Sequence, residues 1–266
     1  YIILTASNEH QAEGFQAQLR QRTFPKRTHV AVLPDPDGRR VGSGGATLGA
    51  IGYIRERETS LGHEGFDHLR ILVIHSGGDS KRTPQYSALG KLFSPVPHEL
   101  PDGRSSTLFD EFMIAMAGVP ARIRDGMLLL SGDVLLLFNP LQIDYAGSGA
   151  AAISFKEDVE TGKNHGVYLR GEDGNVARCL QKQSVDMLRS VGAVNEQNKV
   201  DIDTGAVIFS PDMLASLYAM IQGREQDFIN DHVRLSLYAD FLYPLGSGAT
   251  LEQFYQEKPE GDFSPE

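Results

Sequence analysis

The stretch Ile71–Pro95, "ILVIHSGGDSKRTPQYSALGKLFSP", decides the fold because it begins as an apolar strand and continues into a glycine pair. An apolar run of this length is typical of a strand buried on both faces, as in a parallel sheet. Open α/β sheets bind their ligands in the loops that follow the carboxyl ends of such strands. We therefore expect an α/β protein with a binding site at the end of this strand.

The loop that follows the strand has the composition of a phosphate-binding loop. Gly77 and Gly78 allow backbone N–H groups to approach a phosphate closely. Arg82 can bind two phosphate oxygens at once, while Lys81 and Lys91 carry point charges with longer reach. A tight turn with solvated basic residues is the alternative, and for a glycine pair alone it is the more common case.

A second glycine-rich segment, "GSGGATL" (Gly42–Leu48), is predicted to be a loop that opens an amphipathic helix. The free N–H groups and the dipole at a helix start favour an anion. The segment is neither the Rossmann fingerprint nor a Walker A loop, and a flexible turn explains it equally well. Two such segments in one chain favour a polyphosphate ligand. The predicted nucleotide-binding residues are Gly42, Ser43, Gly44, Gly45, Ser76, Gly77, Gly78 and Lys81.

Asp133 lies within "LLLSGDVLLLF" (Leu128–Phe138), between two apolar runs. A carboxylate in such surroundings is unfavourable unless it is paired or bound to a cation. At the end of a buried strand it is well placed to hold Mg²⁺, which takes one or two carboxylates plus substrate phosphates. The alternative is an aspartate that caps the next element. We predict Mg²⁺ as the cofactor and Asp133 as its ligand.

Three further residues are candidates for contact with a sugar phosphate. His165 and Lys182 flank a predicted hairpin whose turn is "GEDGN" (Gly171–Asn175), and an edge histidine and a surface lysine are the alternatives. Asp203, in "DIDTG", can hydrogen-bond a sugar hydroxyl or join the metal shell. Neither a nucleophile paired with a base nor a zinc pattern is present. The remaining chemistry is charge neutralisation and positioning, which suits phosphoryl or nucleotidyl transfer.

The periodicity of the whole chain predicts strands that alternate with helices. Ser7 is expected to cap a helix that extends to about Gln21 and buries Ala12, Phe15 and Leu19, and Pro211 is expected to start another helix. Strands are predicted at residues 1–6, 29–34, 67–76, 126–138, 151–157, 166–170, 176–182 and 200–210, and an exposed loop at 98–106. This order predicts a Rossmann-like, mostly parallel central sheet with helices on both faces and an antiparallel excursion near residues 166–182.

Composition narrows the possible partners and the setting. A formal charge of −10 argues against nucleic-acid binding, which needs a concentrated basic face. The longest apolar stretch, Met127–Phe138, is too short to span a bilayer, so we expect no membrane association. Cys179, the single cysteine, favours a reducing, cytoplasmic setting. No internal boundary is evident, and the two chain ends predict that residues 1–266 are one core within a longer protein.

Three motifs together resemble the L-fucokinase/GDP-fucose pyrophosphorylase family, in particular its fucose-1-phosphate guanylyltransferase half. They are "DPDGRRVGSGGATL" (Asp35–Leu48), "HSGGDSKRTPQYSALGKLFSPVP" (His75–Pro97) and "SGDV" (Ser131–Val134). The resemblance extends from about Pro34 to Gly246, and more distantly the order of parts is similar to sugar-1-phosphate nucleotidyltransferases. It implies a nucleotidyltransferase core of the glycosyltransferase-A-like type. It also implies a C-terminal β-helix and a fused sugar-kinase domain, which we expect to lie outside this chain.

The resemblance implies a role for each candidate residue. Arg82 and Lys91 would bind the departing pyrophosphate, and Asp133 would hold Mg²⁺, so these three are the predicted catalytic residues. The substrates would be a nucleoside triphosphate, expected to be GTP, and a sugar 1-phosphate, expected to be L-fucose 1-phosphate. The predicted sugar-phosphate-binding residues are His165, Gly166, Lys182, Asp203 and Gly205.

Two departures from the wider pattern keep a rival hypothesis open. Gln183 stands where proline follows the sugar-phosphate lysine in the wider family, and a late second metal carboxylate is not found in this chain. The rival is a non-catalytic nucleotide- or sugar-binding half of a larger fucokinase-type protein. The presence of predicted pyrophosphate-binding residues together with a carboxylate predicted to bind Mg²⁺ argues against the rival hypothesis, because a non-catalytic binding module has less need of both.

Overall fold

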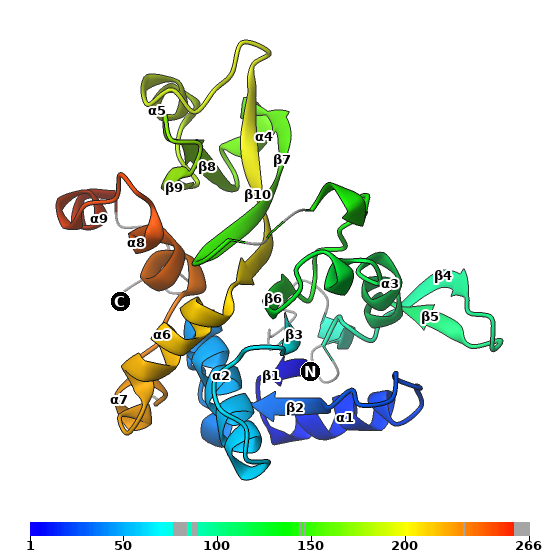
Figure 1. The fold of residues 1–266 in the computed structure, drawn as a ribbon. Coiled ribbons are helices and arrows are strands. Elements are labelled where there is room, and N and C mark those ends of the chain that lie inside the picture. Colours follow the sequence, from blue (N-terminus) through cyan, green and yellow to red (C-terminus); the bar gives the residue numbers. More distant parts are fainter. Residues whose placement is uncertain (77–83, 87–89, 144, 146, 231, 258–266) are drawn as a thin grey trace. The chain divides into compact units, whose positions relative to one another are not determined.

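The computed structural model describes residues 1–76, 84–86, 90–143, 145, 147–230 and 232–257 (Figure 1). The chain divides into two compact units, each built from several stretches of sequence. Unit 1 comprises residues 1–41, 46–151 and 207–233, and unit 2 comprises residues 42–45, 152–206 and 234–266. The expectation of one core over residues 1–266 stays a prediction.

Unit 1 contains the parallel part of the sheet. Its strands pair in the order β2 (Val30–Pro34), β1 (Ile2–Ala6), β3 (Arg70–His75) and β6 (Gly126–Ser131), all parallel. The last residues of β10 (Lys199–Phe209) pair with β6 in the antiparallel direction. The predicted mostly parallel sheet in a mixed α/β fold is therefore confirmed, and the carboxyl ends of β1, β3 and β6 lie at one edge.

Helices flank this sheet through apolar faces. α1 (Glu9–Leu19) buries Ala12, Phe15 and Leu19, as predicted. Its N-cap is Asn8 and not Ser7, because the Asn8 side chain accepts the Gln11 N–H whereas Ser7 bonds to the Gln11 side chain. The other helices with residues in unit 1 are α2 (Gly42–Ser60), α3 (Leu108–Ala115), α6 (Pro211–Ile221) and α7 (Glu225–Phe228). Short 3₁₀ turns occupy Pro36–Gly38, Pro84–Tyr86, Val119–Ala121 and Pro140–Gln142.

Two predicted boundaries in unit 1 are wrong. The strand predicted over residues 126–138 ends at Ser131, opposite His75, the last residue of its neighbour β3. Leu137, expected to be buried, is 79% exposed. The predicted loop at residues 98–106 is confirmed only for residues 100–104, because its two ends belong to a two-stranded sheet of β4 (Pro95–Glu99) and β5 (Ser105–Thr107).

Unit 2 contains the antiparallel part of the sheet. β8 (Gly166–Arg170) pairs in the antiparallel direction with both β9 (Val176–Gln181) and β10, and β7 (Ala150–Asp158) also pairs with β10. This confirms the predicted excursion and extends it to β10. The helical segments of unit 2 are α4 (Val159–Gly162), α5 (Val185–Ser190), a π-helical turn (Leu237–Leu242), α8 (Tyr243–Leu245) and α9 (Leu251–Glu257). Within the described residues, every helix is too short or too polar to cross a bilayer.

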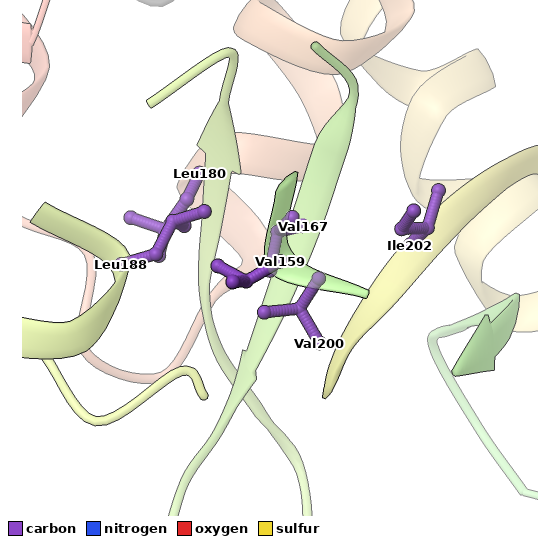
Figure 2. Packing of buried hydrophobic residues seen from close by; sticks show 6 residues of the cluster. All are labelled: Val159, Val167, Leu180, Leu188, Val200 and Ile202. Atoms are coloured by element: carbon purple, nitrogen blue, oxygen red, sulfur yellow. The ribbon is translucent and has the colours of Figure 1, made fainter. Parts of the chain in front are cut away.

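The core of unit 2 covers one face of its strands. Figure 2 shows the buried cluster formed by Val159, Val167, Leu180, Leu188, Val200 and Ile202. Because side chains alternate along a strand, the neighbours of these residues face the opposite side of the sheet. Those neighbours are Gly166, Tyr168, Cys179, Gln181 and Asp203. The opposite face therefore carries Gly166 and Asp203, two of the residues that were singled out from the sequence.

Candidate active site

One group of candidate residues lies in unit 1, at the carboxyl ends of β1, β3 and β6. Ser76, which follows β3, donates its hydroxyl hydrogen to the Thr5 carbonyl at 2.7 Å. The Gly132 N–H donates to the His75 carbonyl at 2.8 Å, and a Cβ at Gly132 would also lie 2.8 Å from that oxygen. Glycine is thus required where the chain leaves β6 against β3. The predicted residue Ser76 is therefore fixed at the base of the phosphate loop.

Lys91 and Asp133 are brought together at this edge. The Lys91 Nζ lies 3.5 Å from the Asp133 Oδ2, and the Ser131 hydroxyl donates to the Asp133 Oδ1 at 2.7 Å. The side chains of Lys91 and Asp133 are 37% and 52% exposed. Solvent-exposed ion pairs contribute only about 0–1 kcal/mol, so anionic or cationic ligands can compete for either partner. The structure thus places two of the three predicted catalytic residues side by side.

The backbone around Lys91 is held tightly. Gly90 has a φ of +67°, and a Cβ there would lie 3.1 Å from the Phe15 ring. The fully buried Leu92 accepts the Phe109 N–H at 2.8 Å. The Phe93 ring lies 5.3 Å, centroid to centroid, from the rings of Phe15 and Phe109. Lys91 therefore extends from a rigid segment whose neighbours on both sides are buried.

A buried ion pair supports this segment from behind. The Arg22 guanidinium binds both carboxylate oxygens of Asp110, at 2.7 and 2.8 Å, and lies 5.0 Å over the Phe93 ring. Burial alone would raise the pKa of Asp110, but hydrogen bonds from Arg22 and Thr107 outweigh it and hold that pKa below its ordinary value. The carboxylate is therefore ionised at neutral pH and fixes the plane of the guanidinium against the ring.

The remaining residues of the predicted phosphate loop are Gly77, Gly78, Lys81 and Arg82. They lie outside the described residues. Their phosphate-binding role stays a prediction, while the structure gives the positions of Ser76 before them and Lys91 after them.

The second glycine segment is not a loop, which corrects the prediction. α2 begins at Gly42, and the Gly44 N–H donates to the Leu235 carbonyl at 2.8 Å. The Ser43 hydroxyl accepts the Leu237 N–H at 2.9 Å, and a Cβ at Gly42 would overlap the Leu235 carbonyl. Close packing in unit 2 thus explains why glycines occur at positions 42 and 44. The nucleotide-binding role of Gly42, Ser43, Gly44 and Gly45 stays a prediction.

Another group of candidate residues lies in unit 2, where β8, β9 and β10 meet. The His165 carbonyl accepts the Lys182 N–H at 3.0 Å, and both residues are exposed. A Cβ at Gly166 would lie 2.8 Å from the Gln181 Oε1 and 3.2 Å from the Asp203 Cβ. Glycine therefore allows these strands to approach closely. All the predicted sugar-phosphate-binding residues are brought together here: His165, Gly166, Lys182, Asp203 and Gly205.

Asp203 is anchored by a set of hydrogen-bond donors. Its Oδ1 accepts the Tyr168 hydroxyl at 2.8 Å and the Gly205 N–H at 2.9 Å, and Tyr238 also hydrogen-bonds its carboxylate. Gly205 has a φ of +75°, a conformation that favours glycine. Burial raises the pKa of Asp203 above its ordinary value, although the hydrogen bonds from Gly205 and Tyr168 oppose the shift. The Asp203 carboxylate is therefore a hydrogen-bond acceptor with a fixed orientation, and it is partly shielded from water.

A pocket opens beside this carboxylate. Burial raises the pKa of the Cys179 thiol in its wall to about 12, so Cys179 is a neutral thiol at physiological pH. Tyr168, Tyr238 and Tyr243 were not singled out from the sequence. Strand alternation could have indicated Tyr168, but no local signal identifies the other two. The pocket is lined by Gly166, Val167, Tyr168, Cys179, Leu180, Gln181, Asp203, Tyr238 and Tyr243.

Asp35 is a second residue that the sequence analysis did not single out. It follows β2, and its N–H donates to the Ala6 carbonyl at the end of β1 at 2.8 Å. Burial raises the pKa of Asp35 to about 6 against the opposing effects of the Val41 N–H and Arg40. This carboxyl therefore titrates close to neutral pH at the same edge of the sheet as Ser76.

The donor set fits a magnesium ion held jointly with a substrate. Within the described residues, no three His, Cys, Asp or Glu side chains lie close enough to form a complete protein metal site. Mg²⁺ commonly takes only one or two protein carboxylates and completes its shell with water and substrate phosphates. Asp133 meets that requirement because it is exposed beside the base of the phosphate loop.

These features define an α/β protein with a Rossmann-like, mostly parallel central sheet. A family model described as the fucose pyrophosphorylase domain matches residues 63–266. The chain belongs to the fucose pyrophosphorylase family, which confirms the resemblance found in its motifs.

Three relatives cover most of this chain. A bifunctional fucokinase/GDP-fucose pyrophosphorylase of Arabidopsis thaliana is 28% identical over 278 residues, which is 91% of this chain. A fucose-1-phosphate guanylyltransferase of Mus musculus is 28% identical over 284 residues, or 94% of this chain. An L-fucokinase/L-fucose-1-P guanylyltransferase of Bacteroides fragilis is 24% identical over 238 residues, or 85%. The matches span 47% of the mouse protein, 26% of the Arabidopsis protein and 24% of the Bacteroides protein.

Proposed function

We propose that this protein transfers a guanylyl group from GTP to L-fucose 1-phosphate and releases pyrophosphate. The observation that carries the proposal is the pairing of Lys91 with Asp133 beside the predicted phosphate loop. Membership of the fucose pyrophosphorylase family and the names of the mouse and Arabidopsis relatives support the choice of base and sugar.

The reaction exchanges one phosphoanhydride bond for another. A phosphate oxygen of fucose 1-phosphate attacks the α-phosphorus of GTP, and the bond from that phosphorus to the bridging oxygen breaks as pyrophosphate leaves. Lys91 and Arg82 would neutralise the charge that develops on pyrophosphate. Asp133 would hold Mg²⁺, which supplies further positive charge to the phosphates when bound.

The residues of unit 2 would bind the sugar phosphate. Lys182 and His165 are exposed at adjacent strand ends, where they can reach the phosphate, while Asp203 accepts a sugar hydroxyl. The proposal includes a cytoplasmic setting, in keeping with the single, neutral Cys179 thiol. It also includes a neighbouring sugar kinase, since the names of two relatives combine both activities.

Pyrophosphate release tests the proposal directly. The purified protein is incubated with Mg²⁺, fucose 1-phosphate and each of GTP, ATP, UTP and CTP, with Asp133→Asn as the comparison. We expect release with GTP and its loss in the variant. No release with any nucleotide, while GTP still raises the Tm, would overturn the enzyme and leave a nucleotide-binding module.

A further inference from the structure

We propose that the pocket beside Asp203 selects a 6-deoxy sugar by enclosing its methyl group against Cys179 and the Tyr243 ring. This inference rests on the proposed function and names the residues that determine its sugar specificity. The pocket lies wholly within unit 2, and its lining includes both the anchored carboxylate of Asp203 and the side chains of Cys179 and Tyr243.

The carboxylate side requires a ligand that donates a hydrogen bond. The Asp203 Oδ1 already accepts from the Tyr168 hydroxyl and the Gly205 N–H, so its position is fixed. A carboxylate only accepts hydrogen bonds when ionised. A sugar hydroxyl is therefore a suitable partner for its remaining acceptor capacity, and an apolar group is not.

The wall formed by the side chains of Cys179 and Tyr243 has its polar hydrogens engaged elsewhere. The Cys179 thiol points its hydrogen at the Leu242 carbonyl, with the Sγ 3.7 Å from that oxygen. The Tyr243 hydroxyl donates to the Glu257 Oε2 at 3.0 Å, so its ring is the part left to line the pocket. Sulfur and aromatic carbon are weak acceptors. A hydroxyl placed against this wall would lose its water without gaining a strong partner, whereas a methyl group would lose nothing.

L-Fucose matches both sides of the pocket. Its C5 carries a methyl group, and the adjacent C4 carries a hydroxyl, so one edge of the ring presents a donor next to an apolar group. L-Galactose differs from L-fucose only in having a hydroxymethyl group in place of that methyl. Comparison of these two sugar 1-phosphates therefore tests only the substituent on C5, which the wall is proposed to recognise.

The experiment measures kcat/KM for L-fucose 1-phosphate and L-galactose 1-phosphate with GTP. Apolar pockets reject an added hydroxyl by about 100-fold, and we expect a preference of that order here. Cys179→Ser supplies an oxygen that can accept from the extra hydroxyl, and it should reduce the preference about 10-fold, the value of one modest hydrogen bond. Cys179→Ala makes room for the hydroxymethyl group and should reduce the preference in the same direction.

One control separates the wall from general effects on unit 2. Val200→Thr places a hydroxyl in the core on the other face of the sheet, so it should lower the Tm and leave the preference unchanged. Equal use of both sugars by the native protein, or a preference unchanged in both Cys179 variants, would overturn the inference while guanylyl transfer stands. Absence of turnover with either sugar would overturn the proposed function itself.

Discussion

The Nζ of Lys91 lies 3.5 Å from the Oδ2 of Asp133, although the two residues follow different strands of the parallel sheet. The pair is open to solvent, so it adds little to the stability of the folded chain. Because the pair lies at the carboxyl edge of β3 and β6, where open α/β sheets bind their ligands, we expect it to serve ligand binding and not stability. An exposed pair can exchange its partners for a phosphate and a cation at low cost in free energy.

Replacing Lys91 with Ala or Asp133 with Asn is therefore expected to affect turnover and not folding. Loss of one group that stabilises transition-state charge commonly lowers kcat by about 10²–10³. The Tm of both variants should remain close to that of the native protein. Steady-state kinetics and thermal unfolding check this expectation, with Lys163→Ala, which breaks an exposed pair with Glu160, as the matched control. A large fall in Tm without a fall in kcat would show that the pair is structural.

Arg22 is expected to affect catalysis through Lys91. The guanidinium holds the Phe93 ring, and Phe93 lies two residues from Lys91 in a buried segment. Arg22→Lys keeps the charge but loses the two-pronged bond to Asp110, so stability should fall by about 1–3 kcal/mol. The kcat should fall as well, because Lys91 loses its support.

A double-mutant cycle distinguishes this positioning role from simple loss of stability. If Arg22 acts through Lys91, then Arg22→Lys should change kcat in the native background and have little further effect in Lys91→Ala. Purely additive losses of kcat in the double variant would contradict the positioning role. The loss of stability should be similar in both backgrounds.

Asp203→Asn should stabilise the protein at neutral pH while damaging its activity. The pKa of Asp203 is raised by burial, so the folded state holds that proton more tightly than the unfolded state. The resulting stability is present below the ordinary pKa of about 4 and is lost as pH rises through the raised pKa. The variant should therefore show a higher Tm than the native protein at pH 7.5, and the difference should shrink as pH falls toward about 4.

The amide of that variant keeps an oxygen for Tyr168 and Gly205 but presents fewer acceptor sites to a sugar hydroxyl. Turnover of fucose 1-phosphate should fall accordingly. Asp201→Asn serves as the control because Asp201 lies on the same strand and pairs with Lys156. A Tm below that of the native protein at every pH would show that the hydrogen bonds of Asp203 outweigh its buried charge.

Two glycines of α2 should respond oppositely to alanine. Gly42 has a φ of +77° and abuts the Leu235 carbonyl, so Gly42→Ala should destabilise the protein by more than 1 kcal/mol, as overpacking typically does by about 1–3 kcal/mol. Gly49 has open space around it, and Gly49→Ala should stabilise the helix by about 0.5–1 kcal/mol. Denaturant unfolding measures both changes. Tolerance of Gly42→Ala would show that the close approach to Leu235 is not needed.

Local periodicity was sufficient to predict most strands and the face of α1. Ala12, Phe15 and Leu19 recur at helical spacing, and their burial follows from that spacing alone. The same reasoning placed Lys182 at the end of β9. The end of β6 could not be predicted in this way, because the apolar run continues beyond Ser131, whereas the paired strand β3 ends opposite that residue.

Contacts between distant parts of the sequence explain the other differences. The sequence around Gly42 predicts a loop, but the conformation of Gly42 is set by its packing against Leu235, which lies far along the chain. Tyr238 and Tyr243 line the Asp203 pocket from the same late segment. Nothing in the residues around them signals that role, since their importance depends on which strand face they cover. Tertiary packing, and not local propensity, decides these positions.

The distribution of sequence between the two units has a consequence for how this protein can be divided. Each unit is assembled from three stretches of chain, and β10 supplies residues to both. Neither unit is one continuous segment of the sequence. Neither can therefore be removed, or exchanged with another protein, as a single segment. The specificity of the pocket beside Asp203 is therefore changed by single substitutions. Transferring that specificity to another protein would require substitution of the individual pocket residues.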